Sequence, residues 1–203
     1  MDADRVTPGR PPAGPIAACA SAAEERAARR AGFRTARVGL AARRGVPEGR
    51  LVSFGVAGGL NGSEVGTVID ATRIVDEQGD VLWEGPGLGV TGARPGTIVA
   101  ARRIVDDPLE RRRLHERTGA DAVDLESGVL AGTGRLDGCV RAISDTPMEP
   151  LGPVGRLLSE KGRLRPSGLL ALALRPAAAA RALGNIRRAL RSLSGASAGG
   201  EGT

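Results

Sequence analysis

Short β-branched apolar runs alternate along this chain with Ala- and Arg-rich stretches, and this alternation limits the fold more than any other feature. Strand-like segments that recur with helix-like segments between them predict an α/β protein. The 203 residues are enough for one domain with a core and too few for two ordinary ones. We therefore expect a single three-layer αβα domain with a central mixed, mostly parallel sheet.

The core of this domain has to be built from aliphatic side chains. There is no Tyr, and Phe33, Phe54 and Trp83 are the only other aromatic residues. Leu, Val, Ile and Ala must therefore fill the interior. The same scarcity removes the aromatic platforms on which proteins stack nucleic-acid bases, so we expect no nucleic-acid partner.

The sequence also predicts where the elements and boundaries lie. We expect a disordered leader at 1–14, the domain at 15–193 and a flexible tail at 194–203, because both ends are rich in Pro or Gly. Asp107 and Pro108 predict the start of the clearest helix, and Gly119 predicts its end. Strand-like segments are 15–19, 33–40, 51–57, 65–75, 120–125 and 138–143, and the other helices are 21–31, one from Glu126, and 176–193.

The net charge of +6 originates at one end of the chain. Residues 156–191 contain nine basic side chains and Glu160 as the only acid, whereas residues 1–155 hold 20 basic and 21 acidic side chains. This distribution indicates a local surface for anions, either phosphates or lipid headgroups. Residues 163–193 either rest on an anionic membrane or close the core.

Other features of the sequence bear on location and cofactors. No apolar run reaches the length of a membrane span, and the start of the chain lacks the pattern of a signal peptide, so a cytoplasmic location is the default. Cys19 and Cys139 stand alone, and His115 is the only His. We expect neither a metal nor a cofactor.

Three short motifs place small or polar groups at predicted strand ends. Gly55 to Leu60 (GVAGGL) lets backbone amides approach a ligand, or forms a tight turn without one. Asp124 to Ser127 (DLES) puts two carboxylates at a strand-to-helix junction, where they could also cap the helix. Ser144 and Asp145 follow a buried strand; Asp145 is a candidate acid because burial raises the pKa of a carboxyl, and the alternative is a turn before Pro147.

In this order the three motifs resemble those of the nucleoside phosphorylase and nucleosidase superfamily. Within it, LVSFGVAGGL (51–60), RRRLHERTGADAVDLES (111–127) and VRAISD (140–145) are most similar to the hopanoid-associated phosphorylases, also called adenosylhopane nucleosidases. The resemblance implies an enzyme that cleaves the N-glycosidic bond of a purine nucleoside. The nucleoside would be adenosylhopane-like, methylthioadenosine-like or adenosylhomocysteine-like.

The resemblance also implies roles for individual residues. Asp145 would protonate N7 of the leaving purine, with Ser144 orienting it or the base, and Glu126 would hold the ribose 2′ and 3′ hydroxyls. Glu24 would activate water, although a surface helix with two exposed Glu is the alternative there. Leu125, in place of the usual Met, would form an apolar wall under the sugar. The remaining contacts to the substrate would come from Ala57 and Gly58.

Several points stay open. Hydrolysis is the preferred reaction and phosphorolysis the alternative: a phosphate acceptor needs an anion site, usually with Arg, and Arg is so abundant throughout the chain that no single Arg is indicated. We expect a homo-oligomer. Residues 83–97 are rich in Gly and Pro where the family builds part of its base-binding wall, so a degenerate protein that binds a nucleoside or a membrane without catalysis is the competing hypothesis.

Overall fold

The computed structural model describes residues 14–60, 62–152 and 176–195. Residues 1–13 of the leader predicted at 1–14, residues 163–175 of the basic segment and residues 196–203 of the predicted tail lie outside them. The strands are β1 (Ile16–Cys19), β2 (Arg34–Arg37), β3 (Leu51–Gly59), β4 (Val68–Val75), β5 (Val81–Glu84), β6 (Arg94–Ala100), β7 (Ala122–Asp124) and β8 (Leu136–Asp145). The helices are α1 (Ala22–Arg30), the 3₁₀ helix η1 (Leu40–Ala42), α2 (Pro108–Thr118), α3 (Ser127–Ala131) and α6 (Pro176–Gly195).

The strands form one mixed, eight-stranded sheet. Its order is β2-β1-β3-β7-β6-β4-β5, and β8 pairs with both β3 and β4. Parallel pairs join β1 to β2 and β3, β3 to β8, and β6 to β4 and β7, whereas β3–β7, β4–β5 and β4–β8 are antiparallel. The prediction of a mixed, mostly parallel sheet is confirmed. Within the described residues, the pairings also close a ring that runs β3-β7-β6-β4-β8 and back to β3.

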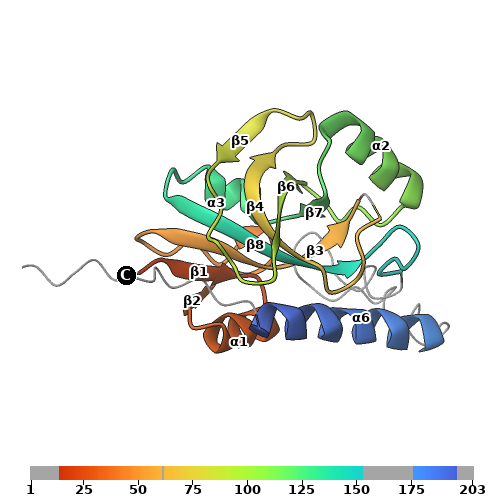
Figure 1. Cartoon of the computed structure of the whole chain (residues 1–203), viewed down its shortest axis with the longest axis horizontal. Coiled ribbons are helices and arrows are strands. Elements are labelled where there is room, and N and C mark those ends of the chain that lie inside the picture. The colour runs from red at the N-terminus through yellow and green to blue at the C-terminus, as the bar shows by residue number, and fades with distance from the viewer. Residues whose placement is uncertain (1–13, 61, 153–175, 196–203) are drawn as a thin grey trace, which may run out of the picture.

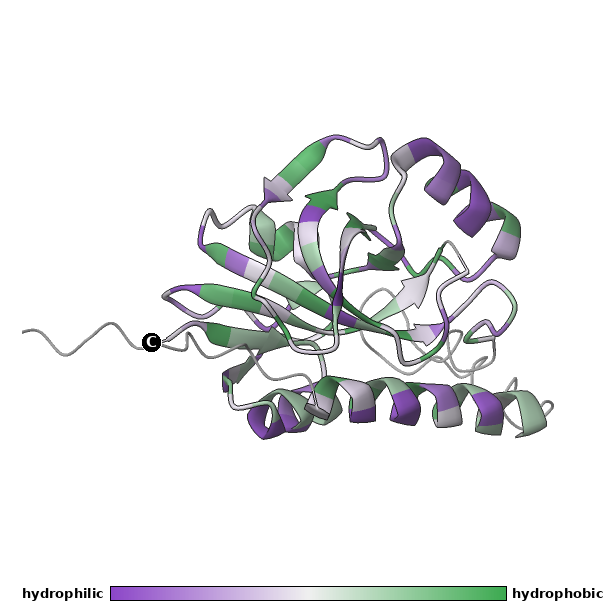
Figure 2. Ribbon diagram, in the orientation of Figure 1, coloured by the Kyte–Doolittle hydropathy of each residue, from purple (hydrophilic) through white to green (hydrophobic). Residues whose placement is uncertain are grey.

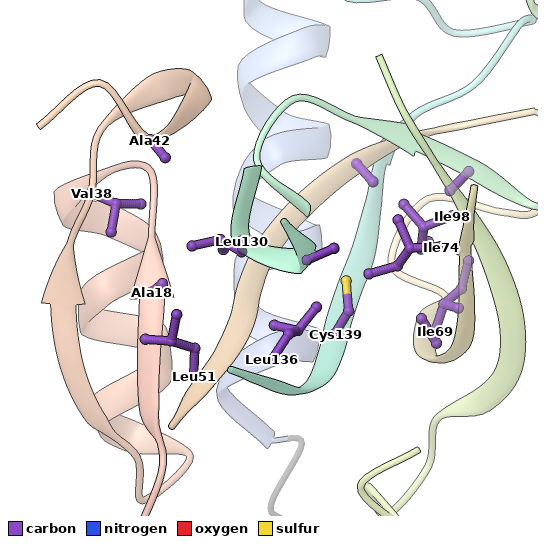
Figure 3. Close-up of a cluster of buried hydrophobic side chains, with 14 of the residues drawn as sticks. Ala18, Val38, Ala42, Leu51, Ile69, Ile74, Ile98, Leu130, Leu136 and Cys139 are labelled. Atoms are coloured by element: carbon purple, nitrogen blue, oxygen red, sulfur yellow. The ribbon is translucent and has the colours of Figure 1, made fainter. Parts of the chain in front are cut away.

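Helices cover the two faces of this sheet. Neighbouring residues of β3 point to opposite faces, as the pleat requires: Leu51 packs in a cluster with Leu130 of α3, and Val52 packs in another with Ala28 of α1 and Leu193 of α6. Figure 1 shows α1 and α6 together on one side of the sheet. Figure 3 shows the aliphatic side chains of the cluster on the other side. The predicted three-layer architecture and aliphatic core are confirmed.

Two helices begin as their sequences predict. Ser21 caps α1 in a capping box: its hydroxyl accepts from the Glu24 N–H, and the Glu24 carboxylate accepts from the Ser21 N–H. Asp107 caps α2, and Gly119 ends it in the left-handed conformation with φ of 67°. The expected bounds of α2, 108–118, are confirmed.

Other segments differ from expectation. Residues 94–100 form β6, although this Gly- and Pro-rich part of the chain carried no predicted strand; Pro95 is the second residue of β6, near the strand start where Pro is tolerated. β3 continues to Gly59, so the alternative of a tight turn within the motif Gly55 to Leu60 is wrong for residues 55–59. α6 ends at Gly195, so residues 194 and 195 are helical and do not belong to a flexible tail.

The last helix, α6, packs against the sheet with one face. Ala189 and Leu193 are fully buried in the core, while Arg187, Arg188 and Arg191 are exposed. Figure 2 shows hydrophilic bands along α6 and on α2, in contrast to the mostly hydrophobic strands. This part of the basic segment therefore closes the core. Among the helices described, none combines the length and the hydropathy needed to cross a bilayer.

Candidate active site

A cavity of about 570 Å³ opens at the carboxyl ends of β3, β7 and β8. Parts of α1, of the segment 39–44 and of α6 complete its wall. All of the site residues predicted from the sequence line this one cavity: Glu24, Ala57, Gly58, Leu125, Glu126, Ser144 and Asp145. Residues up to 121 positions apart in the chain, Glu24 and Asp145, are thus brought to the same site.

The ends of β3 and β8 bring Ser144 and Asp145 to the cavity. The two strands run parallel, so their carboxyl ends meet at the same edge of the sheet. The register shifts between Ala57 and Gly58: Ala57 pairs with Ile143 and Gly58 with Asp145, which leaves Ser144 as the extra residue. Such a bulge redirects the side chains that follow it. Both polar residues belong to the strand, so the alternative of a simple turn is wrong.

Asp145 is buried, and both of its carboxylate oxygens are occupied. Ser144 donates to Oδ1 over 2.6 Å, and Arg111 donates to Oδ2 in a buried ion pair. Burial raises the pKa of Asp145 above its ordinary value, while Arg111 and the Ser144 hydroxyl oppose this rise. The result is a carboxyl that holds a proton more readily than one in water, next to a cation that favours its ionised form.

Glu24 lies on the first turn of α1 and lines the same cavity. It is 5% exposed, so the alternative of a surface helix with two exposed Glu is wrong at this position. The Ser21 N–H donates to Oε2 over 2.7 Å, and the Val56 N–H donates to Oε1 over 2.9 Å. Each oxygen retains a lone pair, because a carboxylate can accept about four hydrogen bonds. The carboxylate is therefore fixed to α1 and β3 and can still accept from a ligand or water.

Glu126 immediately precedes α3 but does not cap it. Its side chain makes no capping hydrogen bond; instead, Oε1 accepts from the Ala41 N–H over 2.8 Å. Among the described residues no hydrogen bond reaches Oε2, which leaves that oxygen available to a ligand. Burial, reinforced by the neighbouring Asp124 carboxylate, raises the pKa of Glu126 to about 8, although Arg141 and the Ala41 N–H oppose this rise.

The segment that reaches Glu126 has an uncommon backbone. Ala41 and Ala42 have φ of 51° and 53°, in the left-handed region that non-Gly residues seldom occupy. Strained backbone of this kind concentrates at functional sites. Here it directs the Ala41 N–H at Glu126, and it is followed by Arg43 and Arg44, which line the cavity and whose side chains are exposed.

Asp124 has a structural role that the sequence left unresolved. It forms a buried ion pair with Arg141, whose Nε donates to Oδ2 over 2.6 Å, and it accepts from the Ser127 hydroxyl over 2.5 Å. The Arg141 Nη2 also donates to the Ser53 hydroxyl over 2.6 Å. The Asp124 side chain, and not that of Glu126, therefore accepts a hydrogen bond at the start of α3. Arg141, which is part of β8, connects Asp124 to Ser53 of β3.

Sequence reasoning missed Arg111 and Arg141, both 1% exposed. Arg141 lies in the middle of a predicted strand, between residues of the core. A charged side chain at such a position needs a buried partner. Arg111 gave no comparable signal, because α2 also contains Arg112, Arg113 and Arg117, all of them exposed. Only its spacing of three from the buried Leu114 marks Arg111 as inward-facing.

The described residues around the cavity include no cluster of metal-ligating side chains. In the described parts of the chain, no group of three or more His, Cys, Asp or Glu side chains is arranged to hold a metal ion. Two of the carboxylates that line the cavity, Asp124 and Asp145, form ion pairs with Arg141 and Arg111.

Comparison with known proteins identifies the fold. No family model and no curated protein sequence matches the chain. A mutant of Helicobacter pylori MTAN, solved with 5′-methylthioadenosine in the active site, matches with a TM-score of 0.53 and 14% identity over 89% of this chain and 98% of that one. A second structure is of H. pylori 5′-methylthioadenosine/S-adenosyl homocysteine nucleosidase with a pyrrolidinol compound; its TM-score is 0.51, with 14% identity and coverage of 88% and 96%.

A third match is a mutant of H. pylori futalosine hydrolase, with a TM-score of 0.50, 12% identity and coverage of 89% and 98%. At these identities the likeness is one of fold. The chain has the mixed α/β fold, with a central mixed sheet and flanking helices, of these nucleosidase structures.

Proposed function

We propose that this protein cleaves the N-glycosidic bond of a purine nucleoside and releases the base. The observation that carries this proposal is that the carboxyl groups of Glu24, Glu126 and Asp145 line one cavity. Carboxyls in different environments can divide acid, base and binding roles among themselves. The fold shared with a nucleosidase that holds 5′-methylthioadenosine in its active site supports the same reaction.

In this proposal Asp145 is the general acid. The bond between C1′ and N9 breaks, its electron pair moves into the purine, and Asp145 gives its proton to N7 of the departing base. The raised pKa of Asp145 supports this role, because a general acid must hold its proton near the working pH. Ser144 orients the acid through its hydrogen bond to Oδ1, and the backbone at Ala57 and Gly58 faces the base.

Glu24 is the general base for water. Water adds to C1′ and gives a proton to the Glu24 carboxylate, which completes hydrolysis. The two backbone hydrogen bonds to Glu24 support this role, because they fix the carboxylate without using all of its lone pairs.

Glu126 binds the ribose 2′ and 3′ hydroxyls. Its Oε2 has no hydrogen bond to the described residues, and Leu125 beside it supplies an apolar surface for the sugar. Hydrogen bonds to this carboxylate would strengthen as the sugar becomes positively charged in the transition state. The pKa of Glu126 is raised to about 8, so hydrogen bonds from the sugar hydroxyls would also favour the ionised form of its carboxyl group.

Phosphate is a second acceptor to test. Arg43 and Arg44 line the cavity, and guanidinium groups bind phosphate well. Phosphorolysis would transfer the sugar to phosphate in place of water, with Asp145 as the acid in both reactions.

The 5′ substituent is proposed to be apolar. Leu40 of η1 and Ile186 and Leu190 of α6 form part of the cavity wall, where they can pack against an aliphatic or thioether group. Adenosylhopane and methylthioadenosine both carry such groups. The exposed Arg residues of α6 could bring a lipid-tailed substrate within reach by contacting an anionic membrane. Vesicle flotation of the wild type and of a variant with Arg187, Arg188 and Arg191 changed to Ser tests that contact.

The reaction is tested by incubating the full chain with adenosylhopane, methylthioadenosine, adenosylhomocysteine and inosine, with and without phosphate. Chromatography should detect free base without phosphate from at least one of them; release only with phosphate would assign phosphorolysis. Asp145→Asn should abolish release, while Asp137→Asn on the same strand should not. No free base from any substrate, together with calorimetric binding of adenine nucleosides, would favour a non-catalytic binding protein. Light scattering of the same sample tests the proposed homo-oligomer.

A further inference from the structure

Arg111 is a buried cation with fixed contacts on several sides. Its Nε donates to the Val105 carbonyl over 2.8 Å and its Nη1 to the Gly59 carbonyl over 3.3 Å, and its Nη2 donates to Asp145 Oδ2. Two of these contacts are to backbone atoms, so the position of the guanidinium is set by the fold and not by Asp145 alone. A cation placed in this way can determine where a carboxylate lies.

A second carboxylate faces the same guanidinium. Asp106 Oδ1 lies 3.8 Å from Arg111 Nη2, and this oxygen is buried and has no hydrogen-bond partner among residues 14–60, 62–152 and 176–195. The other oxygen of Asp106 accepts from the Gly152 N–H over 3.1 Å, which holds the side chain in place. An unpaired buried oxygen is costly, so its position beside a shared cation calls for an explanation.

We propose that Arg111 is a positioning residue for Asp145, and that Asp106 receives the Arg111 guanidinium when Asp145 carries its proton. This inference rests on the proposed function and adds two residues to it. Neither of them touches the substrate in the proposal.

The argument follows from the charges. The structure pairs Asp145 with Arg111, an arrangement that the ionised carboxylate favours. When Asp145 is protonated, its attraction for the guanidinium weakens, and a buried cation without an anion would be strongly destabilising. Asp106 Oδ1 is 3.8 Å away, close enough to form a hydrogen bond after a small movement. Once Asp145 gives its proton to the departing base, its charge returns and Arg111 pairs with it again.

The pair of Arg111 and Asp145 lies directly against the backbone of Gly58. A Cβ atom on Gly58 would lie 3.1 Å from Arg111 Nη2 and 3.2 Å from Asp145 Oδ2. The absence of a side chain at Gly58 therefore leaves the room that the ion pair occupies.

The ionisation of Asp145 depends on groups from several elements. The guanidinium of Arg111, on α2, lowers its pKa; the Asp106 carboxylate, in the segment before α2, raises it; and the Ser144 hydroxyl, on its own strand, lowers it. Glu24 on α1 and Glu126 beside α3 line the same cavity. Arg111 and Asp106 thus act on Asp145 in opposite directions.

Because Arg111 and Asp106 shift the pKa of Asp145 in opposite directions, substitutions of the two residues should move the pH profile in opposite directions. The alkaline limb of kcat/KM against pH reports the loss of the proton from the acid of the free enzyme. In Arg111→Met this limb should move to higher pH, because the cation that favours the ionised form is gone, and kcat should fall about 10- to 100-fold as the carboxylate loses its orientation. In Asp106→Asn the limb should move to lower pH, because Arg111 then pairs with Asp145 alone.

Matched variants separate positioning from structure. Arg113→Met removes an exposed Arg from the same helix and should leave the profile unchanged. Arg111→Lys keeps the charge, so its limb should stay near that of the wild type while kcat falls. If Arg111→Met does not fold, Asp106→Asn and Arg111→Lys still decide the matter. Limbs that stay in place, or that move in the same direction in Arg111→Met and Asp106→Asn, would overturn the proposal.

A direct titration makes the outcome independent of turnover. The ¹³C carboxyl resonance of Asp145 in labelled protein reports its pKa in the wild type and in each variant. Opposite shifts in a protein that cleaves no nucleoside would uphold the positioning role while the proposed function fails. Cleavage by a protein in which the Asp145 titration does not respond to either variant would uphold the function and refute the positioning role.

Discussion

A Cβ atom placed on Gly55 would lie 2.4 Å from the Oε1 atom of Glu24. The same oxygen accepts the hydrogen bond from the Val56 N–H over 2.9 Å. The Glu24 carboxylate can therefore lie against β3 only because residue 55 has no side chain. Backbone that must approach another group closely is one of the few situations that require Gly within a strand.

Gly55→Ala should displace the Glu24 carboxylate and lower kcat about 10- to 100-fold, since a misplacement of about 1 Å can cost this much. The fold should persist, because the atom that must move is the far end of a flexible side chain. Gly184→Ala in α6, where a Cβ would meet nothing within 4 Å, is the control and should leave kcat unchanged. Equal kcat values for Gly55→Ala and the wild type would contradict the role of Glu24.

Glu126 should make the stability of the protein depend on pH. Its pKa rises from an ordinary 4.5 to about 8 on folding, mainly because of burial, so between these values the folded state keeps a proton that the unfolded state has lost. The stabilising contribution is complete below pH 4.5 and is lost as the pH rises through 8. Relative to the wild type, Glu126→Gln should therefore gain roughly 1–3 kcal/mol between pH 5 and pH 9.

Urea unfolding at both pH values measures this difference. Glu116→Gln, an exposed site on α2, is the control and should show the same difference from the wild type at each pH. A Glu126→Gln variant that tracks the wild type at pH 5 and pH 9 would mean that Glu126 ionises normally.

The buried pair of Arg141 and Asp124 should dominate the stability of the site. Arg141→Met leaves an unpaired carboxylate in the interior and should cost about 3–5 kcal/mol. Adding Asp124→Asn should restore part of this loss, because no uncompensated charge then remains. Chemical denaturation of both single variants and the double variant measures the coupling; strictly additive costs would show that the pair does not interact.

Ala41→Gly should stabilise the protein by about 1 kcal/mol, since Gly adopts φ of 51° without the clash that a Cβ causes. The Ala41 N–H would still donate to Glu126. Ala180→Gly, at an exposed helical position of α6, should instead destabilise by about 0.5–1 kcal/mol. Thermal melting compares the two, and a lower melting temperature for Ala41→Gly would argue against backbone strain in the segment 39–44.

Local signals in the sequence were sufficient for much of this fold. Asp107, Pro108 and Gly119 fix the ends of α2, and the apolar runs at 51–57 and 138–143 identify β3 and β8. The predicted site residues follow such runs or caps, and they share one cavity. Parallel pairing of β3 and β8 explains why Gly58 and Asp145 meet at one edge of the sheet, whereas β7, which leads to Glu126, is antiparallel to β3 and reaches the cavity through pairing that no local pattern specifies.

The remaining features depend on distant contacts. β6 is weak in isolation, with Pro95 and Gly96 near its start, and it is ordered by pairing with β4 on one side and β7 on the other. The roles of Arg111 and Glu126 depend on partners 34 and 85 residues away, Asp145 and Ala41. No periodicity within α2 or around Glu126 specifies either partner.

The strands of the closed ring hold the site residues in place, whereas the strands outside the ring are free to vary. Asp124 is the last residue of β7 and Asp145 the last residue of β8, and both strands belong to the ring. β2 and β5 are the outer edges of the sheet. A lengthened loop, a lost hydrogen bond or an added strand at either edge would therefore leave the spacing of those two acids intact. Variation among descendants of this chain should accumulate at β2 and β5 first.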